Sequence, residues 1–299
     1  MADVTLGGVR ALAEASQVAQ HEVIAQVLKE AQPYIEALRG KTLVIKLGGS
    51  ALENQRDALE DIIWLHGLGA RPVLVHGGGA EINEWLERLD IPSVFVRGLR
   101  VTDAATLEVV RMTLAGKVNG ELVRLIGELG GRAVGLTGVD GGLLRVRQID
   151  PELGYVGAVE SVEPGLIAAL SAAGYIPVIA PLGLSADGAV LNINGDDAAA
   201  DLARGLGATK LLYLSDVPGI LDRDGQLLSV LTDEQTRALI ADGVIRGGMI
   251  PKSEAALRAL ETASRVHIVN GHEPHVLIRE LLTHQGAGTM IERARADQD

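Results

Sequence analysis

Residues 42–50 read TLVIKLGGS, and residues 72–80 read PVLVHGGGA. Each segment begins with a short apolar run and ends in consecutive glycines, and helical spacing follows at about Glu53–Leu68 and Ala80–Leu89. Strand, glycines and helix repeated in this order are typical of a parallel sheet with crossover helices. The two segments therefore predict an α/β fold.

The alternation of strand and helix continues along the chain. Four further apolar runs, each after a helix-like stretch, are predicted as strands near Arg132–Leu136, Ile176–Ile179, Lys210–Leu214 and Arg265–Val269. The predicted fold class is a three-layer αβα sandwich with a mainly parallel central sheet that two lobes share. We place the N-terminal lobe at residues 39–185 and the C-terminal lobe at residues 186–299.

Two antiparallel strand pairs are predicted in addition. One is a surface hairpin of Leu143–Gln148 and Tyr155–Val159, and the other joins Ser93–Arg97 to Leu99–Thr102.

The segment before the first strand has helical spacing from about Leu6 to Leu38. Pro33 is expected to kink or split this helix, because proline removes one amide donor and clashes with the preceding turn. Residues 1–38 are therefore assigned to a kinked helix, and two interpretations stay open. The helix either covers the core or forms an arm that builds an oligomer.

The composition excludes several classes of function. A formal net charge of −12 opposes a nucleic-acid surface, because a phosphate backbone is normally met by clustered Lys and Arg. The chain has no cysteine, which rules out disulfides, thiolate metal sites and cysteine nucleophiles. It shows neither a secretory leader pattern nor an apolar run of membrane-spanning length, so we expect a cytoplasmic protein without a membrane partner.

The glycines after the first two strands indicate phosphate binding. Ligands of open α/β sheets bind beyond the carboxyl ends of the strands, so Lys46–Ser50 and His76–Gly79 should share one rim. Glycine lets backbone N–H groups approach phosphate oxygens, and the following helix favours negative charge. The P-loop, dinucleotide, protein-kinase, nucleophile-elbow and HExxH patterns are all missing from the sequence. We interpret His76 as a structural hydrogen bonder rather than a catalyst.

Six motifs together resemble the acetylglutamate kinases of the amino-acid kinase superfamily in order and spacing, over about residues 40–292. They are IKLGG (45–49), HGGG (76–79), GLRVT (98–102), LNINGD (191–196), LSDVPGI (214–220) and GGMIPK (247–252). The resemblance implies a kinase that transfers the γ-phosphoryl group of ATP to the side-chain carboxylate of N-acetyl-L-glutamate. The product would be an acyl phosphate, formed in the second step of arginine biosynthesis.

The resemblance also implies the catalytic residues. Lys46 and Lys252 would hold the charge of the transferred group from opposite lobes, and Asp196 would orient both lysines. Such roles suit phosphoryl transfer, in which catalysis is mainly positioning and neutralisation of charge. The alternative reading of Asp196 is a simple helix N-cap.

Binding residues follow from the same motifs. Arg100 is similar to the family's carboxylate clamp, Asn192 would bind the other end of the acceptor, and Gly78 and Gly79 would add main-chain contacts. Mg²⁺ is expected to bridge the β- and γ-phosphates through phosphate and water, so we name no metal-ligating side chain. The residues implied for the nucleotide are Gly48, Gly49, Asp216, Val217, Pro218, Gly219, Ile220, Leu221, Val244, Ile245 and Arg246.

Two mild departures keep other specificities open, because Leu47 stands where the family often has Tyr, and Gly195 where it has Ala. The first alternative is an acetylaminoadipate kinase of lysine biosynthesis, since one methylene is worth only about 1–3 kcal/mol in discrimination. Glutamate 5-kinase, aspartokinase and carbamate kinase match less well, because Gly98–Thr102 is foreign to them. A non-catalytic regulatory module on the same fold is the other alternative, and it would have lost the lysines or the aspartate.

A regulatory site is implied near the end of the sequence. Members that are inhibited by L-arginine resemble this chain in the N-terminal helix and in the block that contains His267, Glu280, Gly286 and Gly288. Glu280 can pair with a guanidinium, and its alternative reading is a solvated helix carboxylate. The resemblance implies an arginine-sensitive homohexamer, a trimer of dimers joined by the N-terminal helices. Whether a nitrogen-signalling protein also binds is left open.

Overall fold

Eight strands form the central sheet of the computed structural model, which describes residues 22–48 and 56–294. Their order is β12-β14-β13-β11-β1-β2-β8-β5, and neighbours run parallel except β13 and β14. The predicted mainly parallel sheet is confirmed. The strands are β1 (Thr42–Leu47), β2 (Arg71–His76), β5 (Ala133–Thr137), β8 (Ile176–Ala180), β11 (Lys210–Ser215), β12 (Val230–Thr232), β13 (Arg265–Asn270) and β14 (Thr289–Glu292).

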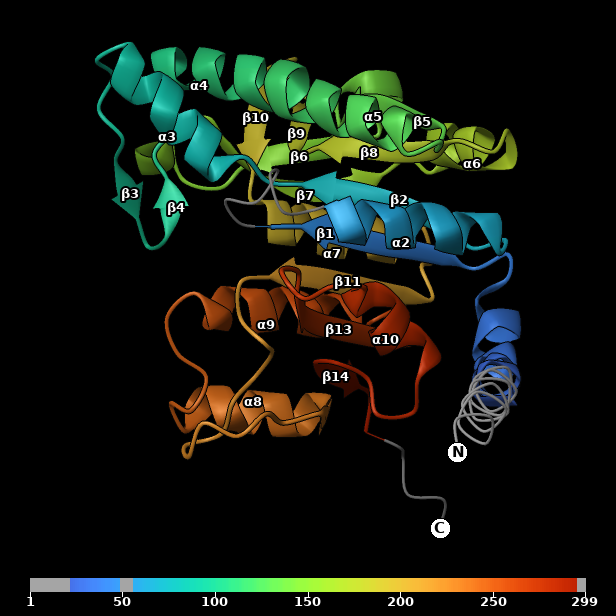
Figure 1. Cartoon of the computed structure of the whole chain (residues 1–299). Helices are drawn as coiled ribbons and strands as arrows, with labels where there is room; N and C mark the ends of the chain where they lie inside the picture. The colour runs from blue at the N-terminus through green and yellow to red at the C-terminus, as the bar shows by residue number, and fades with distance from the viewer. Residues whose placement is uncertain (1–21, 49–55, 295–299) are drawn as a thin grey trace, which may run out of the picture.

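Helices cover both faces of this sheet, as the three-layer prediction requires (Figure 1). Successive residues of β1 point to opposite faces, so Leu43 and Ile45 belong to one buried cluster and Val44 to another. The first cluster packs under α2, α5 and α10, and the second under α6, α7 and α9. The helices are α2 (Arg56–Gly67), α5 (Asn119–Glu128), α6 (Gly165–Ala172), α7 (Gly195–Gly205), α8 (Asp233–Ala241), α9 (Met249–Ala259) and α10 (Val276–Leu282).

A second unit closes into a four-stranded barrel in the order β10-β7-β6-β9. The predicted hairpin supplies β6 and β7, but its expected position on the surface was wrong, because Leu144, Val146 and Val156 are buried. Strands β9 and β10, which were not predicted, pair with the hairpin and cover its apolar side. The barrel strands are β6 (Leu144–Gln148), β7 (Val156–Val162), β9 (Leu182–Ser185) and β10 (Val190–Ile193).

The second predicted strand pair is confirmed in a shorter form. Strands β3 (Phe95–Val96) and β4 (Leu99–Arg100) pair antiparallel close to α3 (Gly79–Arg88). Helix α4 (Ala104–Arg111) then continues through a π-helical segment, η1 (Met112–Val118), directly into α5. Short 3₁₀ turns lie at η2 (Asp140–Gly142) and η3 (Pro151–Leu153).

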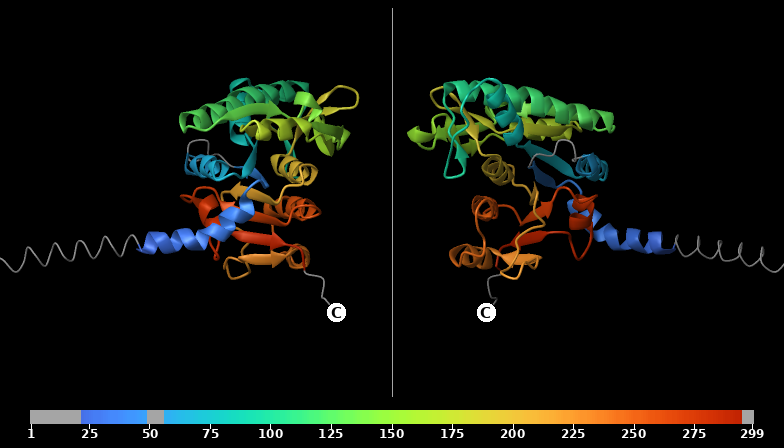
Figure 2. Two further views of the ribbon diagram at one scale, coloured as in Figure 1. Left: turned by 90° about the vertical axis from the view of Figure 1, so that its right-hand side faces the viewer. Right: turned by 60° about the vertical axis from the view of Figure 1, so that its left-hand side comes forward.

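The described part of the N-terminal helix covers residues 22–38 and projects from the body of the molecule (Figure 2). It runs without a break through Pro33, so the proline does not split it. Proline removes the donor to the Lys29 carbonyl, but both residues are exposed and water can replace the lost bond. The helix predicted before residue 22 lies outside the described residues, and the lobe boundary at residue 185 stays a prediction. None of the described helices is long and apolar enough to cross a membrane.

Candidate active site

Lys46, Asp196 and Lys252 are distant in sequence, but they meet near the carboxyl end of β1. Lys46 Nζ lies 2.8 Å from Asp196 Oδ1, in an ion pair without hydrogen-bond alignment. Lys252 Nζ donates a 2.7 Å hydrogen bond to Asp196 Oδ2. Both lysines are buried. The aspartate therefore bridges the two ammonium groups, and the three residues predicted for catalysis form one cluster.

The start of helix α7 holds Asp196 in this position. Asn194 caps the helix, because its Oδ1 accepts a 2.9 Å hydrogen bond from the Asp196 N–H. The reading of Asp196 as a simple N-cap was therefore wrong. Tyr213, from β11, donates a 3.0 Å hydrogen bond to the Asp196 carbonyl, and its ring lies 5.0 Å from Lys252 Nζ. Lys252 itself lies in the first turn of α9.

Two ammonium groups share one carboxylate, so the cluster carries an uncompensated positive charge. Burial raises the pKa of Asp196, but Lys46 and Lys252 outweigh burial and hold that pKa below its ordinary value. Burial lowers the pKa of Lys252, which Asp196 partly opposes. The lysines and the aspartate line a cavity of about 340 Å³. An anionic group that enters this cavity would be stabilised by the excess positive charge.

The same cavity contains part of the predicted nucleotide site. Gly48 requires the absence of a side chain, because a Cβ there would lie 2.9 Å from the Leu214 carbonyl oxygen and 2.6 Å from Lys46 Nζ. Gly49 lies outside the described residues. The predicted residues that line the cavity are Gly48, Asp216, Val217 and Arg246. Those that do not line it are Pro218, Gly219, Ile220, Leu221, Val244 and Ile245.

A second cavity, of about 210 Å³, reaches Gly195, the residue that precedes Asp196. The four predicted acceptor residues all line it, namely Gly78, Gly79, Arg100 and Asn192. Both cavities therefore reach the start of α7, one at Asp196 and the other at Gly195. Neighbouring cavities are what a transfer between two ligands requires, because the reacting groups must come within about 3–3.5 Å of each other.

Arg100 is fixed at the wall of the second cavity. Its guanidinium donates to Ser93 Oγ at 2.6 Å, to Asn83 Oδ1 at 2.7 Å and to the Gly79 carbonyl at 3.3 Å, and it lies 4.7 Å from the centre of the Phe95 ring. A guanidinium has five N–H donors, so Nε–H and one Nη1–H have no partner among the described residues. Burial lowers the pKa of Arg100, and no carboxylate among the described residues opposes this effect.

The residues predicted to bind L-arginine also lie close together. His267, Glu280, Gly286 and Gly288 line a cavity of about 320 Å³, with Tyr34 of the N-terminal helix among the other lining residues. Glu280 Oε1 lies 2.6 Å from His267 Nδ1, and Oε2 accepts hydrogen bonds from the Ala287 and Gly288 N–H groups. Glu280 is therefore buried and ordered, so its reading as a solvated helix carboxylate was wrong.

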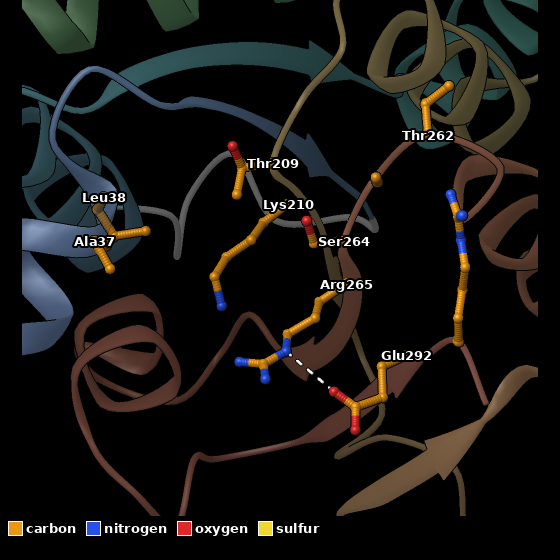
Figure 3. Close-up of a pocket in the computed structure, with 10 residues that line it drawn as sticks. Ala37, Leu38, Thr209, Lys210, Thr262, Ser264, Arg265 and Glu292 are labelled. Atoms are coloured by element: carbon orange, nitrogen blue, oxygen red, sulfur yellow. Dashed lines mark hydrogen bonds and ion pairs between the residues drawn. The ribbon is translucent and has the colours of Figure 1, made fainter. Parts of the chain in front are cut away.

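A larger cavity, of about 580 Å³, lies where β11 and β13 begin (Figure 3). It is lined by Lys210 and Arg265, the first residues of β11 and β13, and by Glu292. It shares Lys210 and Arg265 with the predicted arginine cavity. No residue predicted for catalysis lines it, so its size alone does not make it the active site.

Sequence reasoning missed several residues that shape the site. Tyr213 and Asn194 contact Asp196, and Asn83 holds Arg100. Asn194 had a signal, since asparagine two residues before an acidic helix start is typical of an N-cap. Tyr213 and Asn83 had none, because their contacts join segments that only the fold brings together.

Comparison with known proteins identifies the family. A model of the amino acid kinase family matches residues 41–270. Acetylglutamate kinases from Gloeobacter violaceus and Synechococcus sp. strain JA-2-3B'a(2-13) are 50% and 51% identical to this chain, over 89% of it and 92% and 88% of their own lengths. The chain therefore belongs to the amino acid kinase family, and within that family to the acetylglutamate kinases.

Solved structures agree with this assignment. N-acetylglutamate synthase from Neisseria gonorrhoeae, complexed with coenzyme A and N-acetyl-glutamate, matches with a TM-score of 0.81 at 30% identity over 91% of this chain. This chain spans only 64% of the synthase. The same synthase complexed with coenzyme A and L-arginine matches with a TM-score of 0.79 at 29% identity, over 90% of this chain and 65% of the synthase.

Proposed function

We infer that this chain transfers the γ-phosphoryl group of ATP to the side-chain carboxylate of N-acetyl-L-glutamate. An acceptor carboxylate oxygen forms a bond to the γ-phosphorus while the bond to the bridging β–γ oxygen breaks, so the products are an acyl phosphate and ADP. The observation that carries the proposal is the Lys46–Asp196–Lys252 cluster at the start of α7, which both cavities reach.

The lysines supply charge where the reaction needs it. Charge spreads over the oxygens of the transferred group in the transition state, and fixed cations stabilise it without reorganisation. Asp196 holds both ammonium groups in place before the substrates bind. Because each lysine comes from a different element, β1 or α9, the transferred group is held from two sides.

The acceptor binds in the smaller cavity. Arg100 offers its two remaining N–H donors to a carboxylate of the acceptor. Asn192, whose Nδ2 lies 3.3 Å from Thr102 Oγ1, holds the other end. Gly78 and Gly79 provide main-chain N–H groups. The chemistry of this set fits a small dicarboxylate with an amide, which describes N-acetyl-L-glutamate.

Mg²⁺ accompanies the nucleotide in this proposal. The described residues contain no group of three or more His, Asp or Glu side chains that could hold a metal ion by themselves. Mg²⁺ keeps several waters and binds readily through substrate phosphates, so the lysine-lined cavity is compatible with an ion carried by ATP. The ion would neutralise part of the phosphate charge.

The test is an acyl-phosphate assay with hydroxylamine trapping, run with N-acetyl-L-glutamate and with N-acetylaminoadipate at equal concentrations. We expect hydroxamate from N-acetyl-L-glutamate, with a kcat/KM at least about tenfold higher than for N-acetylaminoadipate, because one methylene in a fitted pocket allows discrimination of this size. A preference for N-acetylaminoadipate would assign the chain to lysine biosynthesis. No hydroxamate from either acceptor, with ATP bound, would support a regulatory module.

L-arginine is proposed as an inhibitor that binds in the 320 Å³ cavity. Three of about four lone-pair sites of the Glu280 carboxylate are occupied by His267, Ala287 and Gly288, which leaves one for a guanidinium. Lys210 at the same cavity can pair with the carboxylate of arginine. Inhibition requires that arginine binds a less active arrangement of the chain more tightly than the active one.

A homohexamer is proposed on the basis of the N-terminal helix. Four large apolar side chains are exposed along it, namely Val23, Ile24, Val27 and Leu28. They fall within about 140° of the helix circumference at 3.6 residues per turn, so they form one apolar face. Pairing of two such faces from neighbouring dimers would cover them. The cavity for arginine includes Tyr34 of the same helix, which would connect assembly to inhibition.

A further inference from the structure

His76 is a buried ionisable residue beside the acceptor cavity, and the transfer mechanism described above does not use it. It ends β2, immediately before the glycines of the HGGG motif, and is 1% exposed. Its Nδ1 lies 2.7 Å from the Gly77 carbonyl oxygen, and its Nε2 lies 3.1 Å from Asn119 Nδ2. Both ring nitrogens therefore have a partner.

The partners of Asn119 fix the orientation of its amide. Nδ2 lies 2.9 Å from the Val178 carbonyl and 3.3 Å from the Leu136 carbonyl. Carbonyl oxygens only accept hydrogen bonds, so the NH₂ group and not Oδ1 must face them. Rotation of the amide by 180° would place an oxygen against two oxygens. The two N–H groups of Asn119 serve these two carbonyls and His76 Nε2, so one N–H is shared, and the donor side of the amide rather than Oδ1 faces His76.

The orientation of Asn119 decides where His76 carries its proton. Nε2 faces a donor, so it must be the unprotonated nitrogen. The proton is then on Nδ1, which faces the Gly77 carbonyl, an acceptor. The two contacts independently require the same neutral tautomer. Burial lowers the pKa of His76 to about 4, which agrees with a neutral ring at neutral pH.

The Gly77 carbonyl in turn orients the next N–H group. The peptide between Gly77 and Gly78 is planar, and no cis peptide occurs among the described residues, so the Gly78 N–H points opposite to the Gly77 C=O. That carbonyl is turned toward His76. The Gly78 N–H therefore points away from His76, on the side where Gly77, Gly78 and Gly79 line the acceptor cavity. It has no acceptor among the described residues.

Gly135 and Leu114 lie close against Asn119 and Gly78, respectively. A Cβ at Gly135 would lie 2.0 Å from Asn119 Oδ1, and a Cβ at Gly78 would lie 2.6 Å from Leu114 Cδ2. Asn119 directly follows the π-helical segment η1, and Leu114 lies within it. π-Helical segments are often found at functional sites. Leu114 of η1 and Asn119, the residue that directly follows η1, thus lie against Gly78 and His76.

We propose that His76 is a positioning residue whose Nδ1–H, selected by Asn119, sets the Gly77 peptide so that the Gly78 N–H donates to the acceptor carboxylate or the transferred phosphoryl group. The proposal rests on the proposed function for the identity of the ligand. Its structural part, the tautomer and the direction of the Gly78 N–H, does not depend on the reaction.

Two substitutions at His76 separate positioning from a general structural role. In asparagine the amide nitrogen is two bonds from Cβ, as Nδ1 is in histidine, so His76→Asn retains the donor to Gly77. In His76→Gln the amide nitrogen is one bond further, near the position of Nε2, so the donor to Gly77 is lost. We expect His76→Asn to keep kcat within about threefold and His76→Gln to lower it about 10²-fold, as for loss of one fixed donor. A rise in the KM of His76→Gln for the acceptor would place the Gly78 N–H on the acceptor carboxylate, and a rise in the KM for ATP would place it on the transferred phosphoryl group.

A measurement without substrate completes the test. Magic-angle-spinning NMR of the full chain labelled with ¹⁵N-histidine, with His76→Asn used to assign the signal, should show a protonated Nδ1 and an unprotonated Nε2 at pH 7. Asn119→Ala removes the donor that faces Nε2, so the proton should no longer be confined to Nδ1. An Nε2–H tautomer in the wild type, or equal kcat for the two His76 variants, would overturn the proposal. If His76→Gln does not fold, the tautomer and the kcat of Asn119→Ala decide the matter. If the wild type phosphorylates neither acceptor, the proposed function fails while the tautomer result still stands or falls by itself.

Discussion

Lys252 donates a 2.7 Å hydrogen bond to Asp196, a residue 56 positions earlier in the sequence. The contact joins the first turn of α9 to the first turn of α7, which are neighbouring helices on one face of the sheet. Because the two side chains are held before any ligand binds, the arrangement of charge does not have to be built during the reaction. Substitutions of Lys252 and Asp196 should therefore change turnover and stability in specific ways.

Replacement of Lys252 by alanine should lower kcat by about 10²–10³, the loss typical of one preorganised group at developing charge. The KM for the acceptor should change little, because Lys252 does not line the acceptor cavity. Steady-state kinetics on the folded variant measure this. Lys41→Ala removes an exposed lysine without a side-chain partner among the described residues and serves as the control. Near-normal turnover of Lys252→Ala would contradict the assigned role.

Replacement of Asp196 by asparagine should destabilise the chain by about 3 kcal/mol, because two buried ammonium groups lose their counter-charge. The phosphates of ATP can replace that charge, so the rise in Tm on adding ATP should be larger than in the wild type. Thermal unfolding at fixed protein concentration gives both values. The pKa of Asp196 is depressed, so the wild type holds this stabilisation above about pH 4 and loses it as the pH falls through the folded-state value. Equal Tm values in the variant and the wild type would contradict the prediction.

Replacement of Arg100 by lysine keeps the charge but removes the planar fork that contacts Ser93 and Asn83. The KM for the acceptor should rise about tenfold or more, while the KM for ATP stays within about twofold. Initial rates with each substrate varied in turn provide the comparison. Arg97→Lys changes a nearby but 75% exposed side chain and should leave both constants unchanged. Equal effects of Arg100→Lys on the two constants would exclude a carboxylate clamp.

Inhibition by arginine should weaken as the pH rises through about 8. Burial, with Arg265 nearby, lowers the pKa of Lys210 to about 8. The ammonium form is the one that pairs with a carboxylate, so the arginine concentration for half-inhibition should rise about tenfold from well below the pKa to one unit above it. Inhibition curves at several pH values give the arginine concentration for half-inhibition as a function of pH. The Lys210→Met variant should be inhibited only weakly by arginine at every pH. Any change of inhibition with pH that remains in this variant comes from the ionisation of arginine itself. An identical dependence of inhibition on pH in the wild type and in Lys210→Met would exclude Lys210 as the partner of the arginine carboxylate.

Replacement of Leu28 by aspartate should break the proposed hexamer into dimers while kinase activity without arginine is retained. Leu28 is 60% exposed on the apolar face of the N-terminal helix, and a charge there opposes burial against a second copy. Lys29→Asp alters the opposite face of the same helix and should keep the hexamer. Light scattering coupled to size-exclusion chromatography reports the molar mass. A wild type that is already dimeric would contradict the assembly proposal.

The sequence alone determined the fold class and most of the central sheet. Short apolar runs such as Thr42–Leu47 and Lys210–Ser215 are buried on both faces, so their pattern is local and readable. The motifs around Lys46, Asp196 and Lys252 identified the family, and the three side chains meet in one cluster in the structure. These features depend on residue type and spacing, which a sequence states directly.

Tertiary structure decided which polar groups meet and which surfaces are covered. The hairpin at residues 144–162 reads as an exposed pair until β9 and β10 close a barrel over it. His76 reads as a generic hydrogen bonder until Asn119, 43 residues away, selects its tautomer. Contacts of this kind are long-range, and each depends on the register of several packed elements at once. For that reason residue spacing was enough to single out the groups proposed for catalysis, whereas only the folded chain shows how their neighbours are oriented.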